Sequence, residues 1–184
     1  MKFTLTILIL SLMAAASAQE ADKNSQDNMA SCPMHAQHGK QSDSHFTGVV
    51  ERGAAHEGMG FSQTATTHHF LLTKDGGIIQ VTANDPQDSK SIAEIQQHFQ
   101  HIAMLFAQGD FSIPHFVHDQ TPPGVRTMKK LRSQLTFTPE QMDHGAKLII
   151  STSSPKALAA VHDFLRFQIR DHRTGDPLSL PNIN

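Results

Sequence analysis

Hydrophobic and polar positions change their period along the chain in an order that predicts secondary structure. Residues 67–73 (THHFLLT) and 78–83 (IIQVTA) read as β-strands, and the Asp-Gly-Gly sequence between them is typical of a tight hairpin turn. An Asp-Pro pair at 85–86 then predicts the start of a helix that ends at Gly109. The apolar face of this helix consists of Ile92, Ile95, Phe99, Ile102 and Phe106.

The second half of the chain repeats this order. Residues 133–138 and 147–152 are strand-like, and Ser154 with Pro155 predicts the start of a second helix. The apolar face of that helix consists of Leu158, Val161, Leu165, Ile169 and His172. The pattern therefore predicts an α+β fold, a two-layer sandwich built from a duplicated ββα unit. Its four-stranded antiparallel sheet would carry both helices on one face.

The beginning of the chain has the pattern of a secretory signal peptide. Lys2 precedes an apolar run over residues 5–13, and Ala16-Ser17-Ala18 supplies a small-x-small cleavage pattern. The run is too short to span a membrane. We therefore predict a signal over residues 1–18, a periplasmic or secreted mature protein, and no membrane anchoring once the signal is removed.

The remaining segments divide into an arm, a folded part and a tail. Residues 19–62 are polar with little apolar periodicity, which predicts a flexible arm with a short strand at 45–51. The folded part is predicted to span residues 63–175 and to include a long apolar connection at 110–131, a kind of segment that is often functional. Residues 176–184 read as a loose tail.

Composition narrows the function classes. The formal net charge is −2 and no basic cluster occurs, so nucleic acid is not a predicted partner. A single cysteine excludes an intramolecular disulfide. The chain has 13 histidines, and imidazole is both the commonest metal ligand and the side chain that titrates near neutral pH. Metal, haem or proton chemistry is therefore the first class to consider.

The arm gathers soft and borderline metal ligands. Cys32, Met34, His35 and His38 lie within seven residues of one another; sulfur ligands suit Cu(I), whereas imidazole suits Cu(II) or zinc. The segment Cys32-Pro33-Met34-His35 resembles the core of short heavy-metal-binding segments in bacterial copper and heavy-metal efflux proteins. That resemblance implies a copper site, with zinc as the second choice. The alternative is a disordered arm whose methionines and histidines are incidental.

A second candidate metal site lies in the folded part. His98 borders the apolar stripe of the first helix, His101 lies one step further out, and His118 belongs to the connection that follows. His68 and His69 point to opposite faces of their strand, so one of them is expected to join the cluster. We predict ligands at His68, His98, His101 and His118. The alternative is that each histidine only forms local hydrogen bonds.

Neighbouring polar residues are assigned lesser roles. Asp119 is expected either to bind the metal or to orient an imidazole. Asp171 reads as an ordinary polar position on a helix, and His162 and His172 read as structural.

Catalytic motifs are missing from the sequence. GxSxG, SxxK, a P-loop, GxGxxG and HExxH do not occur, and a single cysteine excludes CxxCH haem attachment. Non-covalent haem stays open. A small enzyme that uses the histidine cluster of the folded part remains an alternative to metal binding. The sequence assigns no catalytic residues to it.

From Thr67 to Asp176 the chain resembles a group of uncharacterised bacterial secreted proteins. The resemblance rests on the segments THHFLLTKDGGIIQVTANDP, HFQHIAMLFAQGDFSIPHFVH and TPPGV. Some of these proteins carry the name aspartate carbamoyltransferase. This chain has no Ser-Thr-Arg-Thr-like segment for carbamoyl phosphate at a helix start, so the resemblance implies no mechanism.

The prediction from sequence is an exported transition-metal-binding protein, with copper as the expected metal. Its role would be metal buffering, delivery or resistance, and its partners would be the metal ion and a periplasmic protein. Two alternatives stay open. The first is a small exported enzyme that uses the folded histidines, and the second is a module that binds a protein or small ligand without metal.

Overall fold

The computed structural model describes residues 33–180, with side chains described from residue 43 onward. The predicted signal and Cys32 lie outside the described residues. The chain divides into two units, Met1–Gly39 and Lys40–Asn184, and the fold described below is that of the second. Within the described part, no helix combines the length and the apolar character needed to cross a membrane.

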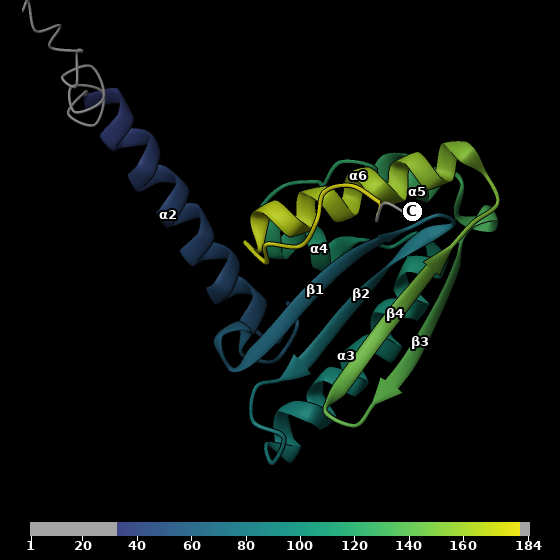
Figure 1. Cartoon of the computed structure of the whole chain (residues 1–184), viewed down its shortest axis with the longest axis horizontal. Coiled ribbons are helices and arrows are strands. Elements are labelled where there is room, and N and C mark those ends of the chain that lie inside the picture. The colour runs from purple at the N-terminus through teal and green to yellow at the C-terminus, as the bar shows by residue number, and fades with distance from the viewer. Residues whose placement is uncertain (1–32, 181–184) are drawn as a thin grey trace, which may run out of the picture. The chain divides into compact units, whose positions relative to one another are not determined.

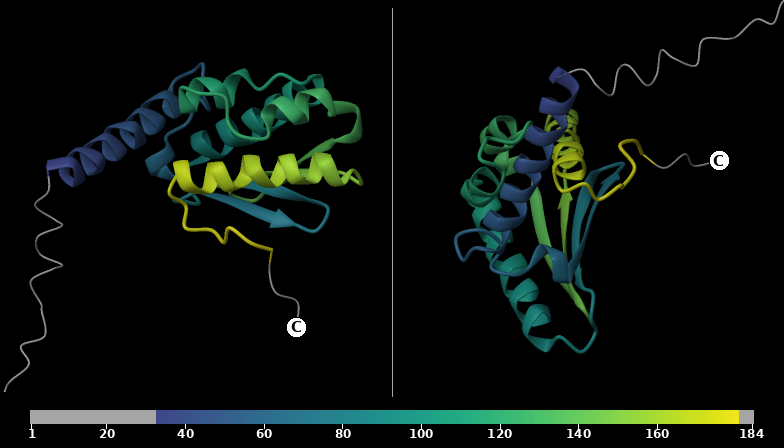
Figure 2. Two further views of the ribbon diagram at one scale, coloured as in Figure 1. Left: turned by 90° about the horizontal axis from the view of Figure 1, so that it is seen from above. Right: turned by 90° about the vertical axis from the view of Figure 1, so that its left-hand side faces the viewer.

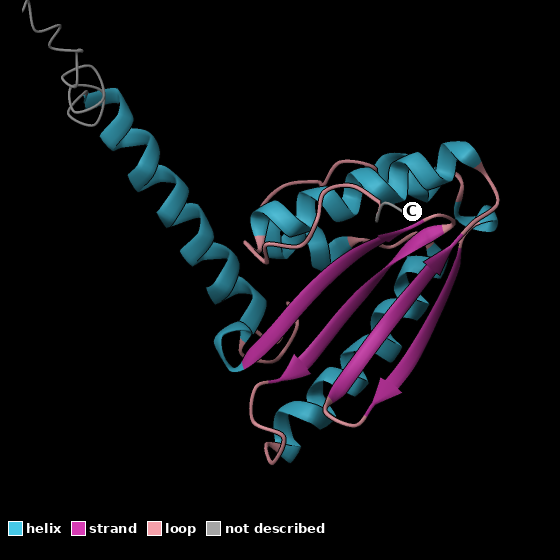
Figure 3. Cartoon of the chain, viewed as in Figure 1, coloured by secondary structure: helices cyan, strands magenta, loops and turns pink. Residues whose placement is uncertain are grey.

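Four antiparallel strands form one open sheet. They are β1 (Thr66–Thr73), β2 (Gly76–Ala83), β3 (Thr136–Met142) and β4 (Gly145–Ser151). Their spatial order is β1-β2-β4-β3, so the two hairpins meet through β2 and β4 (Figures 1 and 3). The predicted α+β fold with a four-stranded antiparallel sheet is confirmed.

Two long helices pack against one face of this sheet. Helix α3 (Ser89–Gln108) contacts β3 and β4, and α6 (Pro155–Asp171) contacts β1 and β2. Inward-facing residues of both helices and the sheet belong to one apolar core, and Figure 2 shows the layers from two sides. Among its fully buried members are Ile95, Phe99, Phe106, Leu148, Phe164 and Leu165. Along the chain each helix follows a hairpin, as in the predicted ββα order, but in space it packs mainly against the strands of the other hairpin.

The first helix begins later than predicted. The Asp88 carboxylate accepts a hydrogen bond from the Ser91 amide at 3.0 Å, so Asp88 and not Asp85 is the N-cap. Asp85 instead accepts from the Gln87 amide at 2.8 Å and forms a turn with Pro86. Both aspartates suit a cap chemically, and sequence alone did not separate them. The predicted end at Gly109 is confirmed.

The second hairpin is also displaced from its predicted position. The segment predicted as strand 133–138 begins with a short 3₁₀ helix (Arg132–Gln134), and β3 runs on to Met142. Pro139 lies inside β3 opposite Leu148. The sheet tolerates this proline because β3 is an edge strand, where one side needs no ladder hydrogen bonds.

The strand predicted at 45–51 is wrong, because these residues belong to helix α2 (Pro33–Ala54). Val49 and Val50 favour a strand locally, but Phe46, Val49, Val50 and Gly53 recur at helical spacing. Val49 is fully buried and Gly53 is buried. Burial of this face against the rest of the unit therefore outweighs the local preference. The predicted arm is helical from Pro33, and its side chains pack from about residue 45 onward.

The long connection between the halves folds into two short helices. They are α4 (Ser112–His118) and α5 (Val125–Lys130). A further 3₁₀ turn, η1 (Gln63–Ala65), leads into β1. The start of the predicted tail is anchored to the sheet, because the Asp176 carboxylate accepts a hydrogen bond from the Phe70 amide at 2.9 Å.

Candidate functional site

Four imidazoles from four different elements line one pocket. They are His68 on β1, His98 on α3, His118 on α4 and His172, which caps the end of α6. The cavity has a volume of about 60 Å³. We call it the histidine pocket. Its other walls are mainly apolar and include Met59, Phe61, Phe70, Val81, Phe99, Phe106, Ile113, Val117 and Phe164.

Local structure explains how these imidazoles come together. On β1 the side chains alternate, so His68 and Phe70 face the core while His69 is half-exposed and bonds to Asp176 at 2.9 Å. On α3, His98 lies one residue before the buried Phe99. Asp110 then accepts a hydrogen bond from the Ser112 amide at 2.8 Å at the start of α4, the helix that ends with the buried His118.

Aromatic rings hold the pocket histidines in place. The His68 ring stacks on His172 with 5.5 Å between ring centroids, and on Phe61 with 6.0 Å. Phe61 also meets the edge of His98 at 5.5 Å, and His172 meets His118 edge-on at 5.0 Å. The four imidazoles therefore belong to one continuous set of ring contacts.

Burial makes three of these histidines weak bases. Burial, together with the nearby His69, lowers the pKa of His68 to about 4. The pKa of His98 is lowered to about 4 by burial, by His101 and by His68. Burial lowers the pKa of His172 well below its usual value. All three are uncharged near neutral pH, so each keeps a lone pair on one ring nitrogen.

Two of these ring nitrogens have no hydrogen-bond partner. Among the described side chains, His68 Nε2 and His172 Nδ1 are buried without a partner, as is Gln63 Oε1. Buried polar atoms are usually paired, and an exception points to strain or to an absent ligand. The unpartnered imidazole nitrogens therefore mark the histidine pocket as the candidate binding site.

The weak basicity of the pocket histidines makes a testable prediction about pH. The free energy of unfolding should fall as the pH decreases from about 6.5 toward 4, because unfolded imidazoles take up protons in this range and His68 and His98 do not. A His68→Phe variant keeps a flat ring in the stack and should show a shallower fall. Urea denaturation over this pH range measures the effect, with His144→Gln at an exposed position as control. An unchanged pH dependence in His68→Phe would contradict the assignment.

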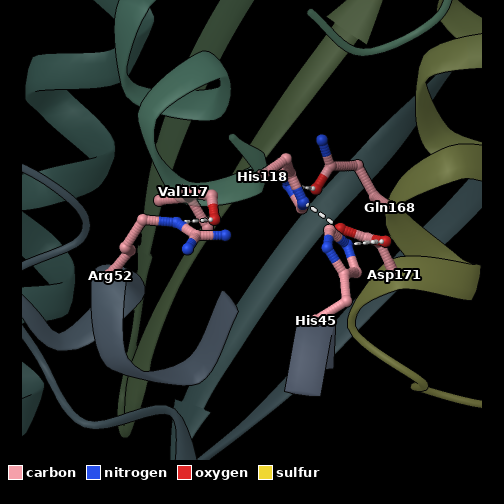
Figure 4. A network of polar contacts seen from close by, with 6 residues as sticks. All are labelled: His45, Arg52, Val117, His118, Gln168 and Asp171. Carbon is pink, nitrogen blue, oxygen red and sulfur yellow. Dashed lines mark hydrogen bonds and ion pairs between the residues drawn. The ribbon is translucent and has the colours of Figure 1, made fainter. Parts of the chain in front are cut away.

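His118 differs from the other three because both of its nitrogens are engaged. Its side chain is 1% exposed; Nδ1 bonds to Asp171 Oδ2, and Nε2 lies 2.8 Å from Gln168 Oε1 (Figure 4). The second Asp171 oxygen lies 2.9 Å from His45 Nε2 on α2. One carboxylate thus joins α2, α4 and α6 at the side of the pocket.

The charge of Asp171 is favoured by its neighbours. Burial by itself would raise the pKa of Asp171, but hydrogen bonds and charge from His118 and His45 bring it below the usual value. Asp171 was expected to be an ordinary helix position, and Asp119 was expected either to bind the metal or to orient an imidazole. The structure reverses these roles, because Asp119 is exposed after α4 whereas Asp171 contacts His118.

Helix α2 supports the same wall of the pocket. The Arg52 Nε–H donates to the Val117 carbonyl at 2.9 Å, next to His118 in sequence (Figure 4). Arg173 bonds to Asp43 at 3.2 Å and lies 4.3 Å from the centre of the Phe46 ring. His45 was expected to belong to a mobile arm, and it is instead part of this attachment.

The residues predicted as metal ligands have different outcomes. His68, His98 and His118 converge on the histidine pocket as expected. His101 does not, because it is exposed on α3 outside the cavity. Cys32 is outside the described residues, and Met34, His35 and His38 lie in the part of α2 whose side chains are not described. The arm site therefore stays a prediction.

Two pocket residues were missed from the sequence. His172 was assigned a structural role, although it lies four residues after Gln168 and therefore on the same side of α6. Met59 belongs to the segment predicted as a flexible arm and was not assigned to any site; its amide donates a hydrogen bond to the Gly53 carbonyl at 2.8 Å. His162 is structural as predicted, since its Nε2 lies 2.9 Å from the Thr73 carbonyl oxygen.

The histidine pocket does not offer three ligands from His, Cys, Asp or Glu to one metal ion. Among the described side chains (residues 43–180), no three from His, Cys, Asp or Glu are arranged to hold a metal ion. In addition, the His68 and His172 rings are within 13° of parallel. Since imidazole lone pairs lie in the ring plane, these two rings do not point at one shared ion. The Met59 thioether lines the same pocket and is therefore considered as a further ligand.

Comparisons with known proteins give no relative for this chain. No protein-family model, curated protein or solved structure matches it.

Proposed function

We propose that the protein binds copper as Cu(I), and that the histidine pocket is one of its binding sites. The observation that carries this proposal is the buried, unpartnered Nε2 of an uncharged His68 in a cavity with further imidazoles and a thioether. A histidine binds a metal through an unprotonated ring nitrogen, and a pKa of about 4 leaves His68 and His98 uncharged at neutral pH, each with one such nitrogen.

The size of the cavity favours an ion over an organic molecule. Its volume of about 60 Å³ is well below the roughly 150 Å³ of a cavity that accepts benzene. Water molecules also fit this volume and would satisfy the imidazole lone pairs, and the copper titration described below distinguishes the two occupants. An enzyme that uses His118 as a base is disfavoured, because Gln168 and Asp171 engage both its nitrogens.

The proposed ligands are His68, His98 and Met59. Thioether and imidazole together suit Cu(I), which accepts low coordination numbers and soft donors. The mainly apolar walls suit a soft ion such as Cu(I) better than a strongly hydrated divalent ion. His172 stacks on His68 and orients its ring. We keep Cys32, Met34, His35 and His38 as a second copper site in the arm, supported by their ligand types and spacing.

The cellular role we propose is copper buffering, delivery or resistance outside the cytoplasm. This role rests on the predicted signal over residues 1–18 and on the two proposed Cu(I) sites, one in the histidine pocket and one in the arm. Zinc is the second candidate for the arm, where sulfur and imidazole ligands serve both metals.

Copper binding can be tested with purified, untagged chain. Cu(I) is titrated anaerobically against a competing chromophoric chelator. A pocket variant carries His68→Phe and Met59→Leu, and an arm variant carries Cys32→Ser, Met34→Leu and His35→Gln. We expect each variant to lose one class of site, and the combined variant to lose both. For the pocket class the affinity should fall by on the order of 100-fold or more, since loss of an outer-shell partner alone costs about 10- to 100-fold.

The exposed His144→Gln variant is the control and should bind copper normally. Thermal unfolding shows whether the pocket variant is folded. Normal affinity and stoichiometry in a folded pocket variant would reject the histidine pocket as a copper site. If only the arm variant lost Cu(I) binding, copper binding would be assigned to the arm alone.

A further inference from the structure

Two surface depressions adjoin the histidine pocket and share residues with it. The first, which we call the outer groove, lies between α3, the start of α4 and residues 56–60. Met59, His98 and Ile113 line both the outer groove and the pocket. The second, which we call the side cleft, lies beside α2 and β1 and shares His68 and His172 with the pocket. The outer groove therefore meets the pocket at two proposed ligands, Met59 and His98. The side cleft meets it at the proposed ligand His68 and at its stacking partner His172.

The two depressions differ in charge. The outer groove is lined by three carboxylates, from Glu57, Glu94 and Asp110, and no lysine or arginine is among its described lining residues. Hydrogen bonds from Ser112 lower the pKa of Asp110 and keep it ionised. The described lining of the side cleft contains neither acidic residues nor lysine or arginine.

Nearby cations reduce the field of the outer groove without cancelling it. Lys90 lies 3.3 Å from Glu94 but is 84% exposed at the rim, where water screens the pair. Lys129 acts on Asp110 from outside the groove lining. The groove also contains exposed His56, His101 and Met104. Imidazole and thioether groups are both copper ligands, and the thioether is the softer of the two.

We infer that the outer groove is the route by which a cation enters the histidine pocket. The carboxylates concentrate the cation at the groove, and Met59 with His98 are the proposed ligands that the groove and the pocket share. Clefts lined by one sign of charge raise the association rate of an oppositely charged ligand. The inference rests on the proposed Cu(I) site, and it assigns to Glu57, Glu94 and Asp110 a role in the rate of uptake rather than in affinity.

The test measures the rate of Cu(I) uptake in the arm variant, so that the pocket supplies the signal. Stopped-flow mixing with a positively charged chromophoric Cu(I) complex follows the transfer. A groove variant carries Glu57→Gln, Glu94→Gln and Asp110→Asn. Its matched control carries Glu140→Gln, Asp143→Asn and Asp163→Asn, which changes the net charge equally at exposed positions elsewhere. We expect about 10-fold slower uptake in the groove variant at low ionic strength, within the range of electrostatic steering.

A second pair of variants tests the route by obstruction. Gln97 lines the outer groove and Thr67 lines the side cleft, and both are exposed. Gln97→Trp should slow uptake, whereas Thr67→Trp should not. Equal rates in the two triple variants, or slower uptake with Thr67→Trp alone, would overturn the route while leaving the copper site intact. Absence of any pocket uptake in the arm variant would overturn the proposed site and the route together.

Discussion

Replacing Asp171 with Ala should lower the free energy of unfolding by about 3 kcal/mol at neutral pH, the low end of what breaking a buried pair costs. The Asp171 side chain is 13% exposed, and the His118 side chain that it contacts is 1% exposed. Removal of the carboxylate leaves His118 Nδ1 buried without a partner and breaks the link from α2 to α6. Urea denaturation of the variant and the parent chain measures the difference.

Two further variants separate the parts of this network. Asp171→Asn keeps an acceptor for His118 but removes the charge, and we expect a smaller loss of about 1–2 kcal/mol. His45→Ala removes the outer contact of the same carboxylate; because the His45 side chain is 38% exposed, we expect a loss below about 1 kcal/mol. A His45→Ala loss as large as that of Asp171→Ala would show that the buried His118 contact is not the main contribution.

The pH dependence of the Asp171 effect has a definite sign. The pKa of Asp171 is lowered in the folded chain, so its stabilising contribution is present above the usual pKa of an aspartate. That contribution is lost as the pH falls through the lower folded pKa. The difference between the parent chain and Asp171→Ala should therefore shrink in acid. A difference that grows in acid would contradict this assignment.

The second large effect is expected from Gly124→Ala. Gly124 has a φ of 82° just before α5, and a Cβ atom there would lie 2.0 Å from the carbonyl oxygen of Ala160 on α6. Both the left-handed backbone and the contact with α6 oppose a side chain. We expect the free energy of unfolding to fall by more than about 3 kcal/mol. Losses of this size arise from specific defects such as steric overlap in the core or backbone strain.

Gly60 provides the matched control for Gly124. Its φ is 79°, but a Cβ atom there would meet nothing within 4 Å. Gly60→Ala should therefore cost about 1 kcal/mol, the cost of the left-handed conformation alone. The difference between the two variants measures the close approach of α5 to α6. Equal losses in urea denaturation would contradict the role assigned to that approach.

The sequence predicted most of the sheet and helices because their patterns are local. The Asp-Gly-Gly turn and the alternating residues of β1 identify the first hairpin without further information. The stripe from Ile92 to Phe106 identifies α3 in the same way. The helix start at Asp88 was misplaced because Asp85-Pro86 offers an equally good cap three residues earlier. Residues 45–51 were misread because their β-branched residues favour a strand until burial against the domain is known.

The histidine pocket was predicted in part. Helical periodicity places His98 at the edge of an apolar face, whereas strand alternation indicates only that one of His68 and His69 faces the core. His101 has nearly the same sequence context but faces the outer groove, and the difference depends on where α4 packs. His172 and Met59 come from segments that do not neighbour His98 in sequence, and no local pattern joins them.

The sequence by itself determined the α+β fold, the two hairpins, the long helices and the presence of soft and imidazole ligands in an arm. Each of these depends on spacing within a few residues, which a single chain displays directly. The tertiary structure decided which histidines share a cavity, that Asp171 and not Asp119 holds His118, and that α2 attaches to this wall. These outcomes depend on how separate elements pack, because burial and pairing arise between residues that are distant along the chain.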